Sequence, residues 1–220
     1  MGLRRQILFV GDVVMSGAGG SPAATGTGGS RGFVLNQKTS FGMPYRTGGA
    51  STANMPGAEN RYVGSGAASF YLDALNNLQL IEGAQWQWDT VICIGGHWDA
   101  YDLGAGVGGA PTLTTTRSRV TTLLDTFRAQ NANCRVFWCN ALPHTNVGVN
   151  NAVIAQNDAV VTDTAARADA SLITIVDINT PYAANASFST EWGLFNAVNT
   201  YGHGLAIAPT IVAALTAAGY

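Results

Sequence analysis

The chain has 220 residues, which is the size of one domain, and 47% of them are hydrophobic, enough for a full core. Charged residues make up only 11% and the net charge is -2, so no basic surface points to nucleic acid or to an anionic membrane. The 27 glycines and the low charge indicate a surface of small neutral residues. Such a surface suits packing within an assembly or binding of a neutral ligand, and compositional drift explains it equally well.

The start of the chain bears on its location. The apolar run at residues 7–10 follows two arginines but is too short for the core of a signal peptide. No stretch of the sequence approaches the length of a membrane span. We therefore expect a soluble protein without a signal peptide.

The three cysteines are an odd set without metal-binding spacing. Cys93 lies in an apolar run, and Cys134 and Cys139 flank another one, so the latter two should point to opposite faces of a strand. We predict buried, reduced thiols, and we expect no metal and no cofactor.

The first apolar run, residues 6–10, ends abruptly in Gly11-Asp12, which is typical of a buried parallel strand that delivers a loop to the edge of a sheet. From about residue 16 to residue 60 the chain is rich in Gly, Ser, Ala and Thr. This stretch contains neither the Gly-Lys-Ser/Thr of a phosphate loop nor the glycine pattern of a dinucleotide turn. We predict a loop insertion in a single domain that covers residues 1–220.

Apolar runs then alternate with stretches of helical periodicity. Helices are predicted at 67–81, 112–130, 150–169 and 203–218, and Pro209 indicates that the regular part of the last one starts near Ala206. The glycine-rich stretches at 95–99 and 104–109 are predicted loops. Strands are predicted to start at Gln6, Thr90, Arg135 and Leu172, with a further one near Arg61. This alternation predicts a parallel sheet covered on both faces, a three-layer α/β/α sandwich.

Four short blocks in the right order resemble those of the SGNH hydrolases, also called GDSL-like lipases and esterases. They are Phe9-Val10-Gly11-Asp12, residues 63–69, residues 91–103, and residues 192–195 with Gly202-His203 after them. The resemblance covers nearly the whole chain apart from the glycine-rich stretch after the first strand. It implies a flavodoxin-like parallel sheet.

The resemblance does not extend to the reactive positions of that family. Members carry a serine after Gly-Asp, an oxyanion glycine in the second block, an asparagine in the third, and Asp-x-x-His in the last. The corresponding positions here hold Val13, Gly66, Trp98, Trp192 and Phe195, with Gly64 as the alternative glycine. Valine, tryptophan and phenylalanine offer no nucleophile, no base and no group to orient a base. The resemblance therefore implies the fold without the serine triad, and no catalytic residue is predicted.

Other side chains could replace the missing groups. We expect structural roles for most of them, such as helix capping or hydrogen bonds to loop backbone. His97 is the best base, because it is predicted on a strand-end loop that faces the cleft, and His144 is expected to be a loop residue. The replacements are Ser16 or Ser65 as nucleophile, His97 or His203 as base, and Asp99 or Asp102 as the orienting group. His97, Asp99 and Asp102 match no metal motif.

The aromatic residues at the family positions have two interpretations. If Trp98, Trp192 and Phe195 converge on Val13, they could fill the former cleft as an apolar plug. They could instead, with His97, form a stacking surface for a sugar. We favour the plug because Val13 suits a dry site.

The sequence is compatible with three alternative functions. The first is a non-catalytic structural or binding module, a component of a larger assembly such as a phage virion, where it would be a decoration or tail-associated protein. Its partners would be other protein subunits, including copies of itself, and the virion setting rests on composition and analogy. The second is an esterase or carbohydrate deacetylase with a displaced Ser-His pair. The third is a glycan-binding module that uses the aromatic residues.

Overall fold

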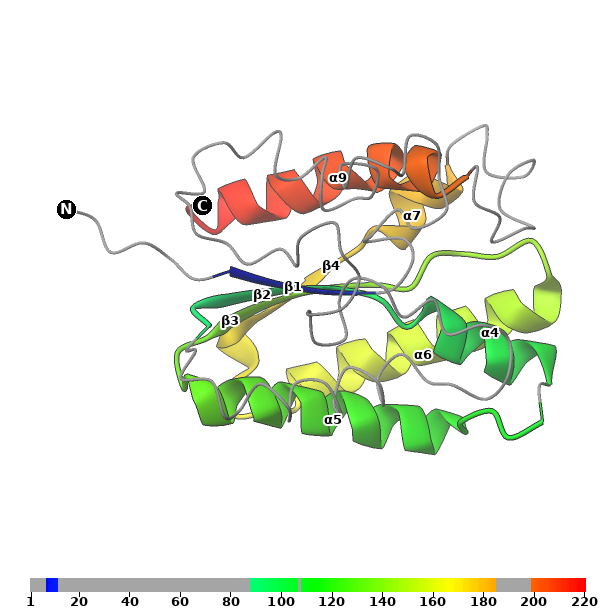
Figure 1. Cartoon of the computed structure of the whole chain (residues 1–220), viewed down its shortest axis with the longest axis horizontal. Helices are drawn as coiled ribbons and strands as arrows, with labels where there is room; N and C mark the ends of the chain where they lie inside the picture. The colour runs from blue at the N-terminus through cyan, green and yellow to red at the C-terminus, as the bar shows by residue number, and fades with distance from the viewer. Residues whose placement is uncertain (1–6, 12–87, 107, 185–198) are drawn as a thin grey trace, which may run out of the picture.

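The computed structural model describes residues 7–11, 88–106, 108–184 and 199–220 (Figure 1). For residues 7–9, 11, 98 and 199–206 only the backbone is described. The insertion predicted at 16–60, the strand predicted near Arg61 and the helix predicted at 67–81 lie outside the described residues.

The described strands form one parallel sheet of four strands in the order β1-β2-β3-β4. Neighbouring parallel strands in this order fit a flavodoxin-like sheet. The predicted starts at Thr90 and Arg135 are confirmed, and the other two were one residue early. The strands are β1 (Ile7–Gly11), β2 (Thr90–Ile94), β3 (Arg135–Cys139) and β4 (Ile173–Val176).

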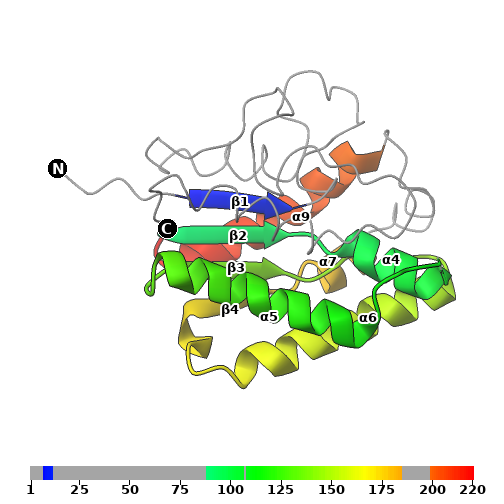
Figure 2. The same ribbon diagram turned by 60° about the horizontal axis from the view of Figure 1, so that its bottom comes forward.

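Helices cover both faces of the sheet, which confirms the three-layer α/β/α sandwich (Figures 1 and 2). One face carries α4 (His97–Ala105), α5 (Leu113–Gln130) and α6 (Val147–Ala165). The other carries α7 (Asn179–Ala183) and α9 (Asn199–Ala217). A short 3-10 helix, η2 (Ala170–Leu172), precedes β4. Among the described residues no helix is both long and apolar enough to cross a bilayer.

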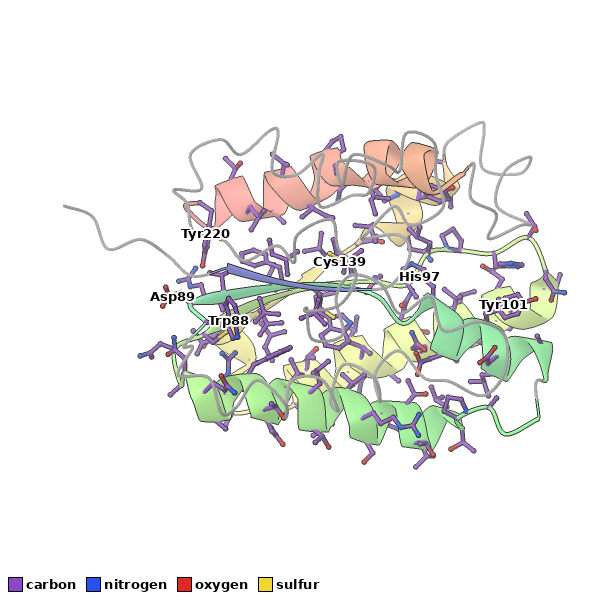
Figure 3. The ribbon with its side chains drawn as sticks, in the orientation of Figure 1. Trp88, Asp89, His97, Tyr101, Cys139 and Tyr220 are labelled. Carbon is purple, nitrogen blue, oxygen red and sulfur yellow. The ribbon has the colours of Figure 1, made fainter. Side chains whose placement is uncertain are left out.

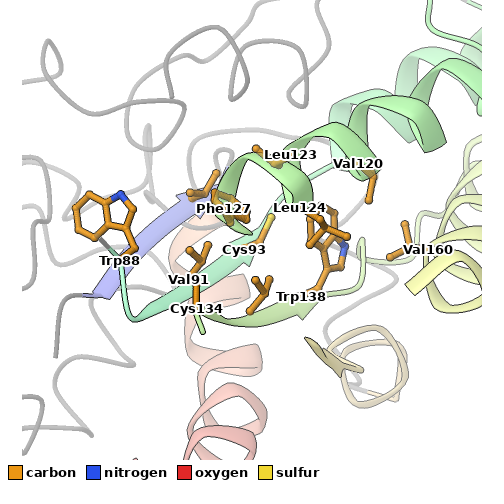
Figure 4. Packing of buried hydrophobic residues seen from close by; sticks show 12 residues of the cluster. Trp88, Val91, Cys93, Val120, Leu123, Leu124, Phe127, Cys134, Trp138 and Val160 are labelled. Carbon is orange, nitrogen blue, oxygen red and sulfur yellow. The ribbon is translucent and has the colours of Figure 1, made fainter. Parts of the chain in front are cut away.

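The larger core lies between the sheet and α5 (Figure 4). Alternate residues of a strand point to opposite faces, so every second residue of β2 and β3 enters this core. The helix contributes the apolar face expected from its periodicity, and all of these side chains are buried. From the strands come Val91, Cys93, Val136 and Trp138, and from α5 come Val120, Leu123, Leu124 and Phe127.

The opposite face of the sheet packs on α9. Ile207, Ile211 and Leu215 of this helix are fully buried. At its end, the ring of Tyr220 meets the Phe137 ring edge-on with centroids 5.5 Å apart, and its hydroxyl lies 2.6 Å from the Thr90 Oγ1 (Figure 3). The described side chains of β2 are buried on both faces, as a continuous apolar strand requires, whereas Thr174 of β4 is exposed.

The cysteines are buried thiols, as predicted. Cys134 belongs to the core under α5, whereas Cys139 follows Phe137 by two residues and so shares the face toward α9. The two thiols point to opposite faces, which confirms the prediction. Burial raises the pKa of the Cys134 thiol to about 12 and also raises the pKa of Cys139, so both remain protonated and unreactive.

The predicted loops at 95–99 and 104–109 were wrong in part, because α4 runs through residues 97–105; residues 95–96 precede it, and Gly106, Gly108 and Gly109 lie in turns after it. Its buried side chains include the polar residues His97, Asp99 and Asp102, so hydrophobic periodicity could not reveal a helix. Gly96, with a φ of 90°, precedes α4 and turns the chain into it. Tertiary packing, and not a local apolar pattern, therefore determines that residues 97–105 form a helix.

The last helix starts at Asn199, so the prediction of a regular start near Ala206 was wrong, and Pro209 lies inside the helix. An internal proline costs about 3 kcal/mol through the lost hydrogen bond and the clash of its ring. Burial of Ile207, Ile211 and Leu215 offsets this, at about 1.5–3 kcal/mol for each large apolar side chain.

The start of α6 lies at Val147, three residues before the predicted one. Asn146 caps it, because its Oδ1 accepts a hydrogen bond from the Val149 backbone N–H at 3.2 Å. In the same way the Thr112 Oγ1 accepts the Thr115 N–H at 3.1 Å and begins α5. The helix also ends earlier than expected, at Ala165.

Ion pairs close the amino-terminal edge of the sheet. The Asp169 carboxylate, just before η2, accepts a hydrogen bond from Arg128 Nε at 2.6 Å and one from Arg167 Nε at 2.7 Å. Arg167 Nη2 also donates to Asp125 Oδ1 at 2.8 Å. The hydrogen bond from Arg167 is the largest reason that the pKa of Asp169 falls to about 2. The network ties α5 to the start of β4.

Candidate functional site

Because the four strands are parallel, the segments that leave them meet at one edge of the sheet, and such an edge is the usual place for a site in an open α/β fold. In the described residues these segments are 95–96 after β2, 140–146 after β3 and 177–178 after β4. β1 ends at Gly11 at this edge. Figure 2 shows α4 and α7 beginning beyond the strand ends.

His97 is the first residue of α4 and is 2% exposed. Asp99 and Asp102 of the same helix are also buried. Residues 97 and 99 lie about 200° apart around a helix axis, whereas 99 and 102 lie only about 60° apart. By this geometry the two carboxyls share a side of α4 that His97 does not. No group of three potential metal ligands occurs among the described residues.

Burial shifts the pKa of Asp102 and of His144 near this edge. Burial raises the pKa of the Asp102 carboxyl, which disfavours the carboxylate. Burial also lowers the pKa of the His144 imidazole. His144 lies in the segment between β3 and α6, as expected, and its Nδ1 accepts the Asn146 N–H at 2.9 Å. The Tyr101 ring meets it edge-on with centroids 5.7 Å apart.

The segment before α4 is attached to α6 by a buried glutamine. Gln156 is 2% exposed, and its Nε2 donates a hydrogen bond of 3.0 Å to the carbonyl of Gly96. The Gly96 carbonyl also accepts the Ala100 N–H at 3.2 Å, within the first turn of α4. The turn that presents His97 is thus held from a helix sixty residues away in sequence.

The far end of α4 touches α6 backbone to backbone. A Cβ on Gly104 would lie 2.4 Å from the Val149 Cα and 2.6 Å from the Gly148 carbonyl oxygen. A Cβ on Gly148 would in turn lie 2.8 Å from the Gly104 carbonyl oxygen. Only glycines allow this approach, so the position of α4 beside the sheet edge depends on both.

Side-chain amides hold the segment after β3. Asn157 of α6 brackets Ala141, because its Oδ1 accepts the Ala141 N–H at 2.9 Å and its Nδ2 donates to the Ala141 carbonyl at 3.0 Å. Asn179 of α7 donates to the same carbonyl at 2.9 Å. The Asn140 N–H donates to the Val176 carbonyl at 3.1 Å. After β4 the Asp177 Oδ1 accepts the Asn179 and Thr180 N–H groups at 3.0 Å each, so both amides and a carboxylate shape this edge.

Sequence reasoning did not identify Gln156, Asn157 or Asn179. Gln156 could have been identified as a polar residue on the apolar face of a predicted helix. The partners of all three lie 16 to 60 residues away, and no local pattern names them.

Most of the predicted site residues cannot be placed in this geometry. Trp98 and His203 fall within α4 and α9, but their side chains are not described. His97 is the one base candidate whose surroundings are described. Outside the described residues lie Val13, Ser16, Gly64, Ser65, Gly66, Trp192 and Phe195.

Comparison with known proteins was made at three levels. No protein-family model matches the chain, and no curated protein matches it. Solved structures do. A carbohydrate esterase of family 3 from Talaromyces cellulolyticus has a TM-score of 0.64 and 17% identity, over 97% of each chain. A variant of an acetyl esterase with acetate bound has a TM-score of 0.61 and 16% identity, over 98% of this chain and all of the other.

A GDSL-like lipase from Parabacteroides merdae is similar as well, with a TM-score of 0.58 and 13% identity over 94% of this chain and 96% of the other. At such identities the likeness concerns the fold. The order of the strands, the layers of helices and these neighbours agree. The chain has the fold of the SGNH/GDSL hydrolases, a group in which the structural neighbours are esterases and lipases.

Proposed function

We propose that the chain is a non-catalytic module with an SGNH fold that acts by binding. The observation that carries the proposal is the identity of the residues at the reactive positions, Val13, Trp98, Trp192 and Phe195. The positions at which β1 ends and α4 begins support the alignment of Val13 and Trp98 with the family's serine and asparagine positions. β1 ends at Gly11, two residues before Val13, and α4 begins one residue before Trp98, where the family has its asparagine.

The test is hydrolysis and covalent labelling of the full chain. We expect no turnover of p-nitrophenyl acetate above the buffer rate, and no labelling by a fluorophosphonate probe under conditions that label an active serine esterase completely. Peptide mapping by mass spectrometry would locate any label. A stoichiometric adduct on Ser16 or Ser65 would overturn the proposal, because it requires an activated hydroxyl.

A second candidate is an ester hydrolase with a relocated nucleophile. It is supported by structural neighbours that are esterases and by a buried imidazole, His97, at the edge where such folds carry their chemistry. If the chain hydrolyses esters, Ser16→Ala or Ser65→Ala should lower kcat by at least about 100-fold, as should His97→Gln. A rate unchanged in all three variants would exclude this candidate.

For the alternative in which Trp98 and Trp192 line an open site instead of forming the favoured plug, we propose a neutral carbohydrate as the ligand. The low charge and the tryptophans at positions 98 and 192 support this class, because sugar rings stack on aromatic faces. A glycan array with the full chain, followed by Trp98→Ala and Trp192→Ala, tests it. Binding that survives both substitutions would remove the aromatic residues from the site. The virion setting remains a proposal from composition alone.

A further inference from the structure

His144 lies between β3 and α6 and is buried. Its Nδ1 accepts the Asn146 backbone N–H at 2.9 Å. An imidazole nitrogen can accept a hydrogen bond only when it carries no proton, so this bond requires the neutral ring with its proton on Nε2. The imidazolium form has a donor at both nitrogens. Protonation would therefore set one N–H group against another at a buried position, and the bond would be lost.

This bond belongs to a set of four that builds the start of α6. The His144 backbone N–H donates to the Asn150 Oδ1 at 3.0 Å, and the Asn150 N–H donates to the Asn146 carbonyl at 2.8 Å. Asn146 also caps the helix, because its Oδ1 accepts the Val149 N–H. Of the four residues that these bonds join, only His144 can change its charge between about pH 5 and pH 8.

The start of α6 in turn determines the position of α4, and Figures 1 and 2 show the two helices side by side. A Cβ on Gly148 would lie 2.8 Å from the Gly104 carbonyl oxygen of α4 and 3.3 Å from the capping Oδ1 of Asn146. The Tyr101 ring of α4 meets the His144 ring edge-on. A change in the bonds of His144 therefore reaches the contact between the two helices within a few residues.

The titratable groups that bear on the charge of His144 come from α4. They are Tyr101, whose ring meets the imidazole, His97 one turn before it, and the buried Asp102 next to it in sequence. From residue 140 to residue 157, which covers the segment after β3 and the first half of α6, His144 is the only titratable side chain. The start of α6 therefore brings no charge of its own to the ring.

We propose that protonation of His144 is an acid-sensitive switch that breaks the bond to Asn146, uncaps α6 and loosens the contact between α6 and α4. The inference goes beyond the proposed function and is independent of it, because it concerns neither the reactive positions nor a ligand. Burial lowers the pKa of the His144 imidazole from its ordinary value of about 6.5. The stability that the neutral ring contributes is therefore fully present above about pH 6.5 and is lost as the pH falls through the lowered value.

Nuclear magnetic resonance of the full chain labelled with ¹⁵N tests the state of the ring. Long-range ¹H–¹⁵N spectra at about pH 7.5 should place the His144 proton on Nε2, and a titration should give a midpoint below about 6.5. The signal that is missing in His144→Asn identifies the residue. A proton on Nδ1 at pH 7.5, or a midpoint at or above 6.5, would overturn the proposal.

Hydrogen exchange of the backbone amides tests the release of the helix. In His144→Asn the side-chain oxygen can take the place of Nδ1 as acceptor, and it does not titrate. Between about pH 7.5 and one pH unit below the measured midpoint, the protection factors of Asn146 and Val149 should fall more in the wild type than in this variant. The excess should be about tenfold for each pH unit by which the midpoint lies below 6.5.

The amide of Gly104 reports on α4 in the same experiment, and its protection should also fall more in the wild type than in His144→Asn. Equal pH dependence of the wild type and His144→Asn at Asn146 and Val149 would show that His144 is not the switch. A response at these two amides without one at Gly104 would contradict the proposed coupling of α6 to α4.

Discussion

Different interactions stabilise the two edges of the sheet, at the amino-terminal and at the carboxyl-terminal ends of its strands. At the amino-terminal edge, Arg128 and Arg167 share the Asp169 carboxylate, and the hydrogen bond with Asp169 is the largest reason that the pKa of Arg167 is raised. At the carboxyl-terminal edge, Gln156 and Asn157 bond neutral backbone groups. One edge favours charged forms and should depend on pH and salt. The other depends mainly on close backbone packing and on hydrogen bonds of side-chain amides, with the Asp177 carboxylate accepting the Asn179 and Thr180 N–H groups.

The difference also concerns the candidate site. Burial raises the pKa of Asp102 and lowers that of His144. The Asp177 carboxylate at the same edge accepts hydrogen bonds from the Asn179 and Thr180 N–H groups at 3.0 Å each. The carboxyl-terminal edge therefore combines neutral amides with a carboxylate at the start of α7.

The largest expected effect is at the contact of α4 with α6. In Gly104→Ala the new methyl group would lie within 2.4 Å of the Val149 Cα, so the backbones must separate. We expect a loss of about 3 kcal/mol or more in the free energy of unfolding, measured with urea.

Gly108→Ala is the matched control, because nothing lies within 4 Å of a Cβ at that position. This variant should change stability by less than about 1 kcal/mol. Equal stability of the two alanine variants would mean that α4 and α6 do not touch as described.

The second effect concerns the hydrogen bonds around Ala141. Asn157→Ala removes both bonds to this buried residue and leaves its N–H unsatisfied. We expect a loss of about 2 kcal/mol. Asn151→Ala, at an exposed position of the same helix, should cost no more than about 0.5 kcal/mol. Because the groups are neutral, the difference between the two variants should be the same at 0.05 M and 1 M NaCl.

The smallest effect belongs to the ion pairs of the amino-terminal edge. Asp169→Asn should cost about 1–2 kcal/mol at pH 7, and Asp163→Asn, whose partner Arg117 is 48% exposed, less than about 0.5 kcal/mol. Unlike the Asn157 effect, this cost should fall when salt is raised to 1 M.

The pH dependence of the Asp169 effect follows from its depressed pKa. The carboxyl has a pKa of about 2 in the folded protein, below the ordinary value of about 3.9. Its contribution to stability is therefore present above about pH 4 and is lost as the pH falls through 2. The stability difference between wild type and Asp169→Asn should shrink over this range. A constant difference would show that the carboxylate is not paired in solution.

Local pattern was sufficient for much of the fold. The strands at Thr90 and Arg135 and the apolar face of α5 followed from apolar runs and from helical periodicity. Prediction from local pattern was wrong at α4, whose buried side chains include carboxyls, and at the start of α9, which Pro209 suggested would lie later in the chain. In both places tertiary burial overrode the local preference.

The candidate site was predictable only in part. His97 is at the carboxyl-terminal edge of the sheet as expected, but it begins a helix instead of standing on a loop. The amides that shape this edge were missed because each bonds a backbone group far away in sequence. Seven predicted positions, among them Val13 and Trp192, lie outside the described residues.

By itself, the sequence determined the alternation of strands and helices and therefore the three layers, because apolar periodicity is a local property. The tertiary structure decided how the two sheet edges are held and which carboxyls have a shifted pKa. Hydrogen bonds across tens of residues, the approach of Gly104 to Gly148 and the burial of Asp102 exist only once distant segments meet.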